Sequence, residues 1–211
     1  MVDHKDKFIY IHIPKTGGSS IESALKCEQY SFTRVSSEGN LQVAPWVSNK
    51  WYNKHDPLFK KAINDNAFKF AFVRNPFDLM VSCFHWWLLP KGKNWPQGRF
   101  KKEFGDITFP QFIKKTSALY LNEYSHKKQG QSFWLRDATG AIKVDFIGRF
   151  ENIQQDFNTI CNEIGIPQID LPHINKTKHK HYTESYDDDS REIVADSFAV
   201  DIEHFDYKFG E

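Results

Sequence analysis

Two apolar runs lie along the chain, and each leads through a short polar segment into a helical pattern. Residues 8–13 (FIYIHI) and 68–73 (FKFAFV) are rich in β-branched and aromatic residues, which predicts two buried strands. A short helix is expected over residues 19–27, with three apolar side chains on one side: Ile21, Ala24 and Leu25. The N-terminal part of the chain is therefore expected to form a strand, a loop and a helix.

The second run leads into a longer helix. Pro76 suits the first position of a helix, because its φ is already helical and its missing N–H is not needed there. We expect this helix to continue to about Leu89, with an apolar stripe formed by Phe77, Met80, Val81, Phe84 and Leu88. The strand–helix arrangement of the N-terminal part is thus repeated.

Mixed patterning continues to the C-terminus. A helical pattern covers residues 109–121, and residues 131–150 (QSFWLRDATGAIKVDFIGRF) indicate two strands joined by the turn Asp-Ala-Thr-Gly. Residues 151–164 predict a helix that stops at Gly165. A closing helix is expected to begin among residues 187–189, where three aspartates favour a helix N-terminus.

Alternating strands and helices predict an α/β fold with a central parallel sheet flanked by helices. With 211 residues, the chain is expected to form a single domain over residues 1–211. Residues 90–107 are rich in Gly, Pro and Lys and predict a long exposed loop.

Composition excludes several classes of function. Charged residues make up 26% of the chain and the net charge is +1, which gives no basic excess for nucleic-acid binding. We see neither a signal peptide nor an apolar run long enough to span a membrane, so a cytoplasmic location is expected. The three cysteines, Cys27, Cys83 and Cys161, are expected to be buried free thiols.

Residues 14–20 (PKTGGSS) join the first strand to its helix. Gly17 and Gly18 allow close approach of the backbone to a ligand, and successive N–H groups before a helix form an anion site. Lys15 adds a positive charge and Thr16 a hydroxyl group. The ATPase pattern G-x-x-x-x-G-K-[ST] is absent, because the lysine precedes the glycines. An ordinary tight turn is the alternative.

Residues 73–82 carry a second polar group at a strand end. Arg74 and Ser82 are spaced so that both would lie away from the apolar stripe and could grip one phosphate. The alternative interpretation is that Arg74 forms an ion pair with Asp78 or caps an edge of the sheet.

These motifs carry a family resemblance. HIPKTGGSS resembles the 5′-phosphosulfate loop of sulfotransferases that use 3′-phosphoadenosine 5′-phosphosulfate (PAPS), and VRNPFDLMVS resembles their 3′-phosphate motif. The similarity is greatest to the carbohydrate type, related to heparan and chondroitin sulfotransferases and to small prokaryotic members. It continues through VDFIGRFENIQQDF, LPHINKT and DIEHFDYKF.

The resemblance implies a P-loop-like fold and a set of roles. Lys15 would contact the sulfate and the bridging oxygen, and the 5′-phosphate would be held by Thr16, Gly17, Gly18, Ser19 and Ser20. Arg74 and Ser82 would hold the 3′-phosphate, and Arg149 would help to bind the donor or would pair with Glu151. The product would be adenosine 3′,5′-bisphosphate (PAP), and no metal is required because the donor carries its own activated anhydride.

A general base must take the proton of the acceptor hydroxyl, and histidine suits neutral pH. His55 is our candidate, since a histidine in this place resembles the proposed base of heparan-type enzymes. An exposed histidine without a catalytic role is the alternative. Glu22 is a second candidate base, whereas His12 and His85 are expected to be structural.

Two segments are expected to complete the site. The resemblance suggests that residues 172–184 close over the nucleotide, with Lys176, Lys178 and Tyr182 reaching phosphate or adenine. A solvated basic loop, or a metal site built on its histidines, is the alternative. Residues 90–107, with Trp95 and several cations, form a candidate platform for an anionic glycan acceptor.

We therefore expect a cytoplasmic, PAPS-dependent O-sulfotransferase that acts on a carbohydrate hydroxyl. An ATP-dependent P-loop-type kinase and a nucleotide-binding module without turnover are the alternatives.

Overall fold

A computed structural model describes residues 8–27, 33–35, 41–43, 68–88, 104–116, 130–136, 140–172 and 180–211, together with Phe100 and Lys102. Contacts divide the chain into two compact units. The first comprises Met1–Arg74 and Trp134–Asn175, and the second comprises Asn75–Phe133 and Lys176–Glu211. The single domain expected from the sequence stays a prediction.

The first unit contains a five-stranded sheet in the order β3-β2-β1-β4-β5. Strands β1 (Phe8–Ile11), β2 (Thr33–Val35), β4 (Phe68–Val73) and β5 (Phe146–Arg149) are joined by parallel pairings. Strand β3 (Leu41–Val43) pairs antiparallel with β2 at one edge. The α/β fold with a parallel sheet, predicted from the sequence, is confirmed.

The two apolar runs form strands because both faces of the sheet are buried. Side chains alternate along a strand, so Tyr10 and Phe70 face one side, where they stack with their ring centroids 5.0 Å apart. Ile11 and Ala71 face the other side and have no exposed surface. Burial on both faces explains the nearly continuous apolar character of β1 and β4.

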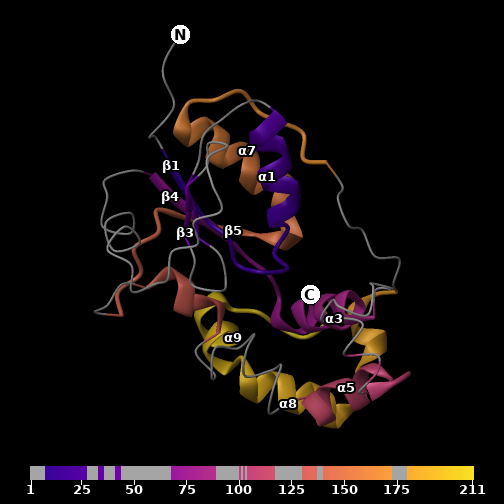
Figure 1. The fold of residues 1–211 in the computed structure, drawn as a ribbon. Coiled ribbons are helices and arrows are strands. Elements are labelled where there is room, and N and C mark those ends of the chain that lie inside the picture. The colour runs from indigo at the N-terminus through magenta and orange to yellow at the C-terminus, as the bar shows by residue number, and fades with distance from the viewer. Residues whose placement is uncertain are drawn as a thin grey trace. The chain divides into compact units, whose positions relative to one another are not determined.

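Helices α1 (Gly18–Cys27) and α7 (Ile153–Ile164) lie side by side against one face of this sheet (Figure 1). Ile21 and Leu25 of α1 and Phe157 of α7 join the same apolar cluster as Tyr10 and Phe70. Helix α7 follows the 3-10 turn η3 (Phe150–Asn152) and ends at Gly165, as predicted.

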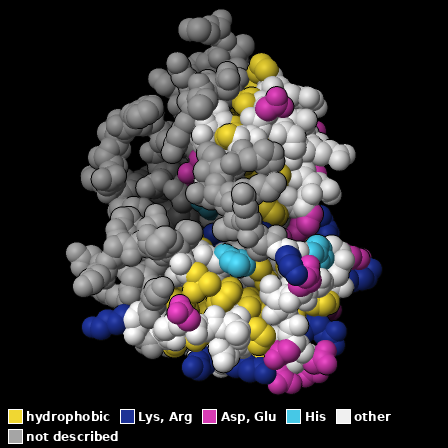
Figure 2. Space-filling model, turned by 90° about the vertical axis from the view of Figure 1, so that its right-hand side faces the viewer, with side chains coloured by type: hydrophobic (Ala, Val, Ile, Leu, Met, Phe, Trp, Pro, Cys, Tyr) yellow, Lys and Arg dark blue, Asp and Glu magenta, His cyan; other side chains and the backbone are white. Residues whose placement is uncertain are grey.

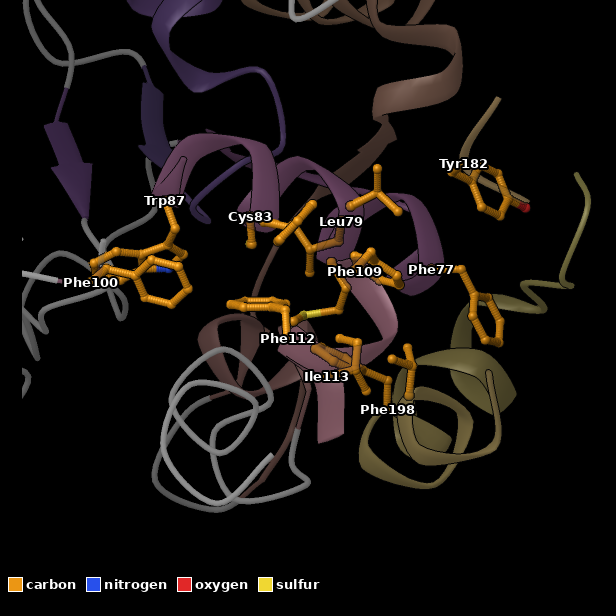
Figure 3. Packing of buried hydrophobic residues seen from close by; sticks show 14 residues of the cluster. Phe77, Leu79, Cys83, Trp87, Phe100, Phe109, Phe112, Ile113, Tyr182 and Phe198 are labelled. Carbon is orange, nitrogen blue, oxygen red and sulfur yellow. The ribbon is translucent and has the colours of Figure 1, made fainter. Parts of the chain in front are cut away.

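The second unit is helical and has its own core (Figure 3). It contains α3 (Pro76–Trp87), α5 (Phe109–Thr116), η4 (Tyr182–Ser185), α8 (Asp188–Ser197) and α9 (Ala199–Phe205). Phe112 and Phe198 are fully buried in its core. The predicted starts of two helices are confirmed: Pro76 opens α3, and Asp187 caps α8 through a reciprocal bond pair with Ser190.

The predicted strand pair over residues 131–150 is wrong in its first half. Residues Gln131–Leu135 form the 3-10 helix η2, and an isolated bridge joins Arg136 to Ile142. The cause is tertiary. In the second unit, the buried Asp201 carboxylate accepts hydrogen bonds from the N–H groups of Gln131 and Ser132, at 2.7 and 3.2 Å, and so caps the turn.

The exposed loop predicted over residues 90–107 is also corrected in part. Phe100, Lys102 and Phe104 have helical conformation, and Phe100 is 1% exposed, packing on Trp87 with ring centroids 5.5 Å apart. Phe100 and Phe104 therefore contribute to the core of the second unit.

Charged side chains of both signs are interspersed on the face drawn in Figure 2. This mixture agrees with the net charge of +1. None of the helices in the described part of the chain has the length and apolar character needed to cross a bilayer.

Candidate active site at the strand ends

Three neighbouring parallel strands of the first unit end at the same edge of the sheet. Strand β1 continues into residues 12–17, β4 continues into Arg74, and β5 continues into Phe150. In open parallel sheets, ligands bind outside the carboxyl ends of the strands. The predicted phosphosulfate loop and Arg74 both lie at this edge.

The loop after β1 has an unusual backbone path. Lys15 has a φ of 68° and Gly17 a φ of 88°, both in the left-handed region. For a non-glycine residue such as Lys15 this conformation costs about 1–3 kcal/mol. Thr16 is fully buried, and its hydroxyl donates to the carbonyl of Ile13 at 2.8 Å. The Thr16 hydroxyl proton is therefore used in a hydrogen bond within the loop. The main-chain N–H of Thr16 is the donor that suits a ligand.

Neighbouring side chains leave no room for a Cβ atom at Gly17 or Gly18. A Cβ atom on Gly17 would overlap Cδ1 of Ile153 and lie 3.2 Å from Cδ2 of Phe150. A Cβ atom on Gly18 would overlap Nε2 of His12 and lie 2.5 Å from its Cε1. The loop is therefore packed tightly between β1 and the start of η3 and α7.

The loop passes directly into α1. The carbonyl of Gly17 accepts hydrogen bonds from the N–H groups of Ser20 and Ile21, at 3.0 and 3.3 Å. The N–H groups of Gly18 and Ser19 thus belong to the first turn, where a helix offers no internal acceptor and the helix dipole is positive. Ser19 is exposed and Ser20 half-buried. This arrangement is chemically suited to a phosphate or sulfate group.

Arg74 meets the loop directly. Its Nη1 donates to the carbonyl oxygen of Lys15 at 2.9 Å, and its Cζ lies 3.9 Å from the centroid of the Phe150 ring. Arg74 is 7% exposed. A hydrogen bond from a charged donor contributes about 1.5–3 kcal/mol, which is similar to the cost of the left-handed conformation of Lys15.

His12 and Glu22, which flank the loop in sequence, form a hydrogen-bonded pair. Nδ1 of His12 donates to Oε1 of Glu22 at 2.5 Å, and the two side chains are 13% and 11% exposed. The pair joins the end of β1 to the second turn of α1. The structural role expected for His12 agrees with this contact. Glu22, the second candidate base, is held against His12 and is 8% exposed as a residue.

Arg149 ends β5 and is half-buried. Its main-chain N–H donates to Oδ2 of Asp156 at 2.6 Å, and Asp156 lies in the first turn of α7. This bond fixes the start of η3 and therefore the position of Phe150. The donor-binding role of the Arg149 side chain stays a prediction.

Ser82 and Tyr182 belong to the second unit. Ser82 is half-buried on α3, as is Asp78 one turn earlier, so both lie off the apolar stripe. The Tyr182 hydroxyl donates to the carbonyl of Glu211 at 3.0 Å and accepts from the N–H of Gly210 at 2.7 Å. Tyr182 thus contacts the last residues of the second unit, and its contact with a nucleotide stays a prediction. The joint grip of Arg74 and Ser82 on one phosphate stays a prediction.

Several predicted site residues lie outside the described residues. They are the candidate base His55, the covering-loop residues Lys176 and Lys178, and Trp95 of the acceptor platform. Within the described ranges, no group of three or more His, Cys, Asp or Glu side chains gathers in a way that could hold a metal ion.

Phe150 and Ile153 are contact residues that the sequence did not single out. They enclose Gly17, and Phe150 also stacks on Arg74. The available signal was their position where a predicted strand meets the following predicted helix, in the segment GRFENI.

Comparison with known proteins agrees with these observations. A family model described as "Sulfotransferase family" matches residues 1–208. A protein of Archaeoglobus fulgidus, named only as an uncharacterized protein, is 26% identical over 125 residues, which cover 58% of this chain and 88% of that protein. Because the family model spans nearly the whole sequence, the chain belongs to the sulfotransferase family.

Proposed function

We propose that this protein transfers a sulfuryl group from PAPS to a hydroxyl of a carbohydrate acceptor and releases PAP. Membership of the sulfotransferase family supports sulfuryl transfer, and sulfotransferases generally use PAPS. The observation that carries the choice of donor is the contact between Arg74 and the Lys15 carbonyl, 2.9 Å long, at the ends of two adjacent strands. A single nucleotide with phosphate at both ends of its ribose would touch both residues.

The loop and the first turn of α1 hold the 5′-phosphosulfate in this proposal. The main-chain N–H groups of residues 16–19 and the hydroxyls of Ser19 and Ser20 face the anion. Lys15 contacts the sulfate and the bridging oxygen, where it stabilises the negative charge that develops as PAP departs. Arg74 and Ser82 bind the 3′-phosphate, and Arg149 assists.

The reaction is an in-line displacement. The acceptor oxygen forms a bond to sulfur, the bond from sulfur to the bridging oxygen breaks, and the electron pair leaves with PAP. Such a transfer depends mainly on positioning and charge stabilisation, which rigid loop and strand-end residues supply. His55 takes the acceptor proton as general base. Lys176 and Lys178 close over the bound nucleotide.

The acceptor is proposed to be a carbohydrate because the motifs resemble those of carbohydrate sulfotransferases. The basic and aromatic segment 90–107 would then bind an anionic glycan.

Transfer of ³⁵S from labelled PAPS to a panel of glycans and small hydroxyl compounds tests this function. We expect labelled product on a glycan, formed in the presence of EDTA and lost in His55→Ala. Nucleotide binding without labelled product for any acceptor would instead support a binding module. If only small hydroxyl compounds become labelled, PAPS is supported as the donor and the proposed carbohydrate acceptor is wrong.

A further inference from the structure

Arg74 makes two contacts within the protein that are separate from its proposed binding of phosphate. Its Cζ lies over the Phe150 ring, 3.9 Å from the centroid, and Nη1 donates to the main-chain carbonyl of Lys15. The ring contact and the hydrogen bond together restrict the position of the guanidinium. Arg74 is 7% exposed, so its side chain packs against the loop and has little contact with solvent.

Phe150 contacts the loop at a second point. A Cβ atom on Gly17 would lie 3.2 and 3.4 Å from Cδ2 and Cε2 of the Phe150 ring, so the ring leaves no ordinary space for a side chain at residue 17. Phe150 is therefore a neighbour of both the Arg74 guanidinium and Gly17. Its own position is fixed by η3, which begins at the end of β5.

The two contacts act on the two left-handed residues of the loop. Arg74 bonds the carbonyl of Lys15, whose φ is 68°, and Phe150 packs on Gly17, whose φ is 88°. Between these residues lies Thr16, and Gly17 is followed by the first turn of α1. Any change in these dihedral angles would redirect the N–H groups that form the anion site.

We propose that Arg74 and Phe150 form a brace that holds the residue 15–17 backbone in its anion-binding shape. Arg74 is then a positioning residue for the 5′ end of the donor, in addition to binding the 3′-phosphate. This inference rests on the proposed function for the identity of the nucleotide. The brace itself consists of contacts within the protein.

Lysine cannot replace arginine in this brace. An ammonium group keeps the charge but has no plane to stack on Phe150, and it cannot hold a ring and a carbonyl at once in fixed geometry. Arg74→Lys therefore keeps the positive charge for the 3′-phosphate but removes the support of the loop. Phe150→Leu removes the aromatic face and leaves Arg74 in place.

Arg136→Lys is a matched control. Arg136 lies in the same unit, and its Nη1 also donates to a main-chain carbonyl, that of Gly140, at 2.8 Å. The same substitution there removes the same kind of bond without touching the loop. Phe146→Leu, in β5, is the control for the aromatic change, because Phe146 packs against the apolar cluster beneath the sheet rather than on the loop.

The test is titration calorimetry, in EDTA, with AMP and with PAP. AMP carries the 5′-phosphate only, so a residue that binds solely the 3′-phosphate has no effect on it. We expect Arg74→Lys and Phe150→Leu to weaken AMP binding roughly tenfold, measured as the dissociation constant, and both controls to leave it unchanged. An unchanged AMP affinity in Arg74→Lys, with weaker PAP binding, would overturn the brace and keep the 3′-phosphate role.

Hydrogen exchange of the main-chain amides of residues 16–21 in unliganded protein gives a second readout. Faster exchange in Arg74→Lys and Phe150→Leu, but not in Arg136→Lys, is the expected result. Exchange rates equal to those of the wild type would overturn the brace even if the fold is intact by circular dichroism. If wild-type protein binds neither nucleotide, the proposed donor fails, whereas the exchange measurement still decides the brace.

Discussion

Nη1 of Arg74 donates a hydrogen bond to the main-chain oxygen of Lys15 at 2.9 Å, across 59 positions of sequence. Lys15 and Arg74, which the family resemblance assigns to opposite ends of one nucleotide, therefore meet at one edge of the sheet. The contact follows from topology, because β1 and β4 are adjacent and parallel, with Ile11 beside Ala71 at the end of their pairing. The roles of these residues and of their neighbours can be tested one at a time.

Lys15→Met is expected to lower the rate of sulfuryl transfer by about a hundredfold or more, because the charge on the bridging oxygen loses its partner. Methionine keeps the length of the side chain. Turnover of labelled PAPS measures the effect, and Lys143→Met, an exposed change in the same unit, is the control. A rate near that of the wild type would show that Lys15 does not act on the reacting group.

Gly17→Ala is expected to abolish donor binding and lower the melting temperature. The added methyl group meets Ile153 and Phe150, and alanine also resists a φ of 88°. Gly140→Ala is a matched control, because Gly140 has a φ of 87° and an added methyl group there would meet nothing within 4 Å. The difference between the two variants thus measures the packing of the loop. Equal melting temperatures and equal nucleotide affinities in the two variants would contradict the packing described for Gly17.

Glu22→Ala is expected to destabilise the protein by about 1–3 kcal/mol, because the nearly buried Nδ1–H of His12 loses its acceptor. Glu22→Gln retains an acceptor oxygen and should recover part of the loss. Urea unfolding gives the free energies, with Glu163→Ala, at an exposed position of α7, as the control. If Glu22→Ala instead matches its control in stability, the pair does not anchor α1 to β1.

Asp187 makes the second unit sensitive to acid. Bonds from the Ser190 hydroxyl and N–H, and then from Lys114, lower the pKa of the Asp187 carboxyl from 3.8 to about 2. A carboxyl with a lowered pKa stabilises the folded state above its unfolded pKa, and this contribution is lost as the pH falls from 3.8 towards 2.

Asp187→Asn keeps a capping oxygen but removes this titration. We therefore expect its melting temperature to fall less steeply than that of the wild type between about pH 4 and about pH 2. Asp188→Asn, at the next position, is the control. Parallel melting curves for wild type and Asp187→Asn over that range would argue against the lowered pKa.

Local patterns were sufficient to predict the elements that frame the loop. Strand β4 occupies the predicted residues, and α1 and α3 begin within one residue of their expected starts, because apolar periodicity, Pro76 and the glycines act locally. Strands β2 and β3 were not predicted, since three residues each give no usable periodicity. The residue 131–135 segment was assigned to a strand, because the carboxylate that caps it, Asp201, is 70 residues away.

Of the residues that form the site, the sequence predicted only those whose own chemistry suits an anion. Lys15, Gly17 and Arg74 carry local signals, whereas Phe150 acts through contacts with residues far away in the sequence. The bond between His12 and Glu22 was likewise missed, because each residue alone has an ordinary structural explanation. The bonds of the Tyr182 hydroxyl to Gly210 and Glu211 were not predicted either, and its contact with a nucleotide stays a prediction.

The identity of the nucleotide is the central claim, and calorimetric titration of the wild-type protein tests it most directly. Adenosine 3′,5′-bisphosphate and ATP are compared in EDTA and again with Mg²⁺. The account predicts that the bisphosphate binds roughly tenfold or more tightly than ATP, independently of the metal, because the proposed role of Arg74 and Ser82 is to bind a 3′-phosphate that ATP lacks. Preferential binding of ATP that requires Mg²⁺ would contradict the account.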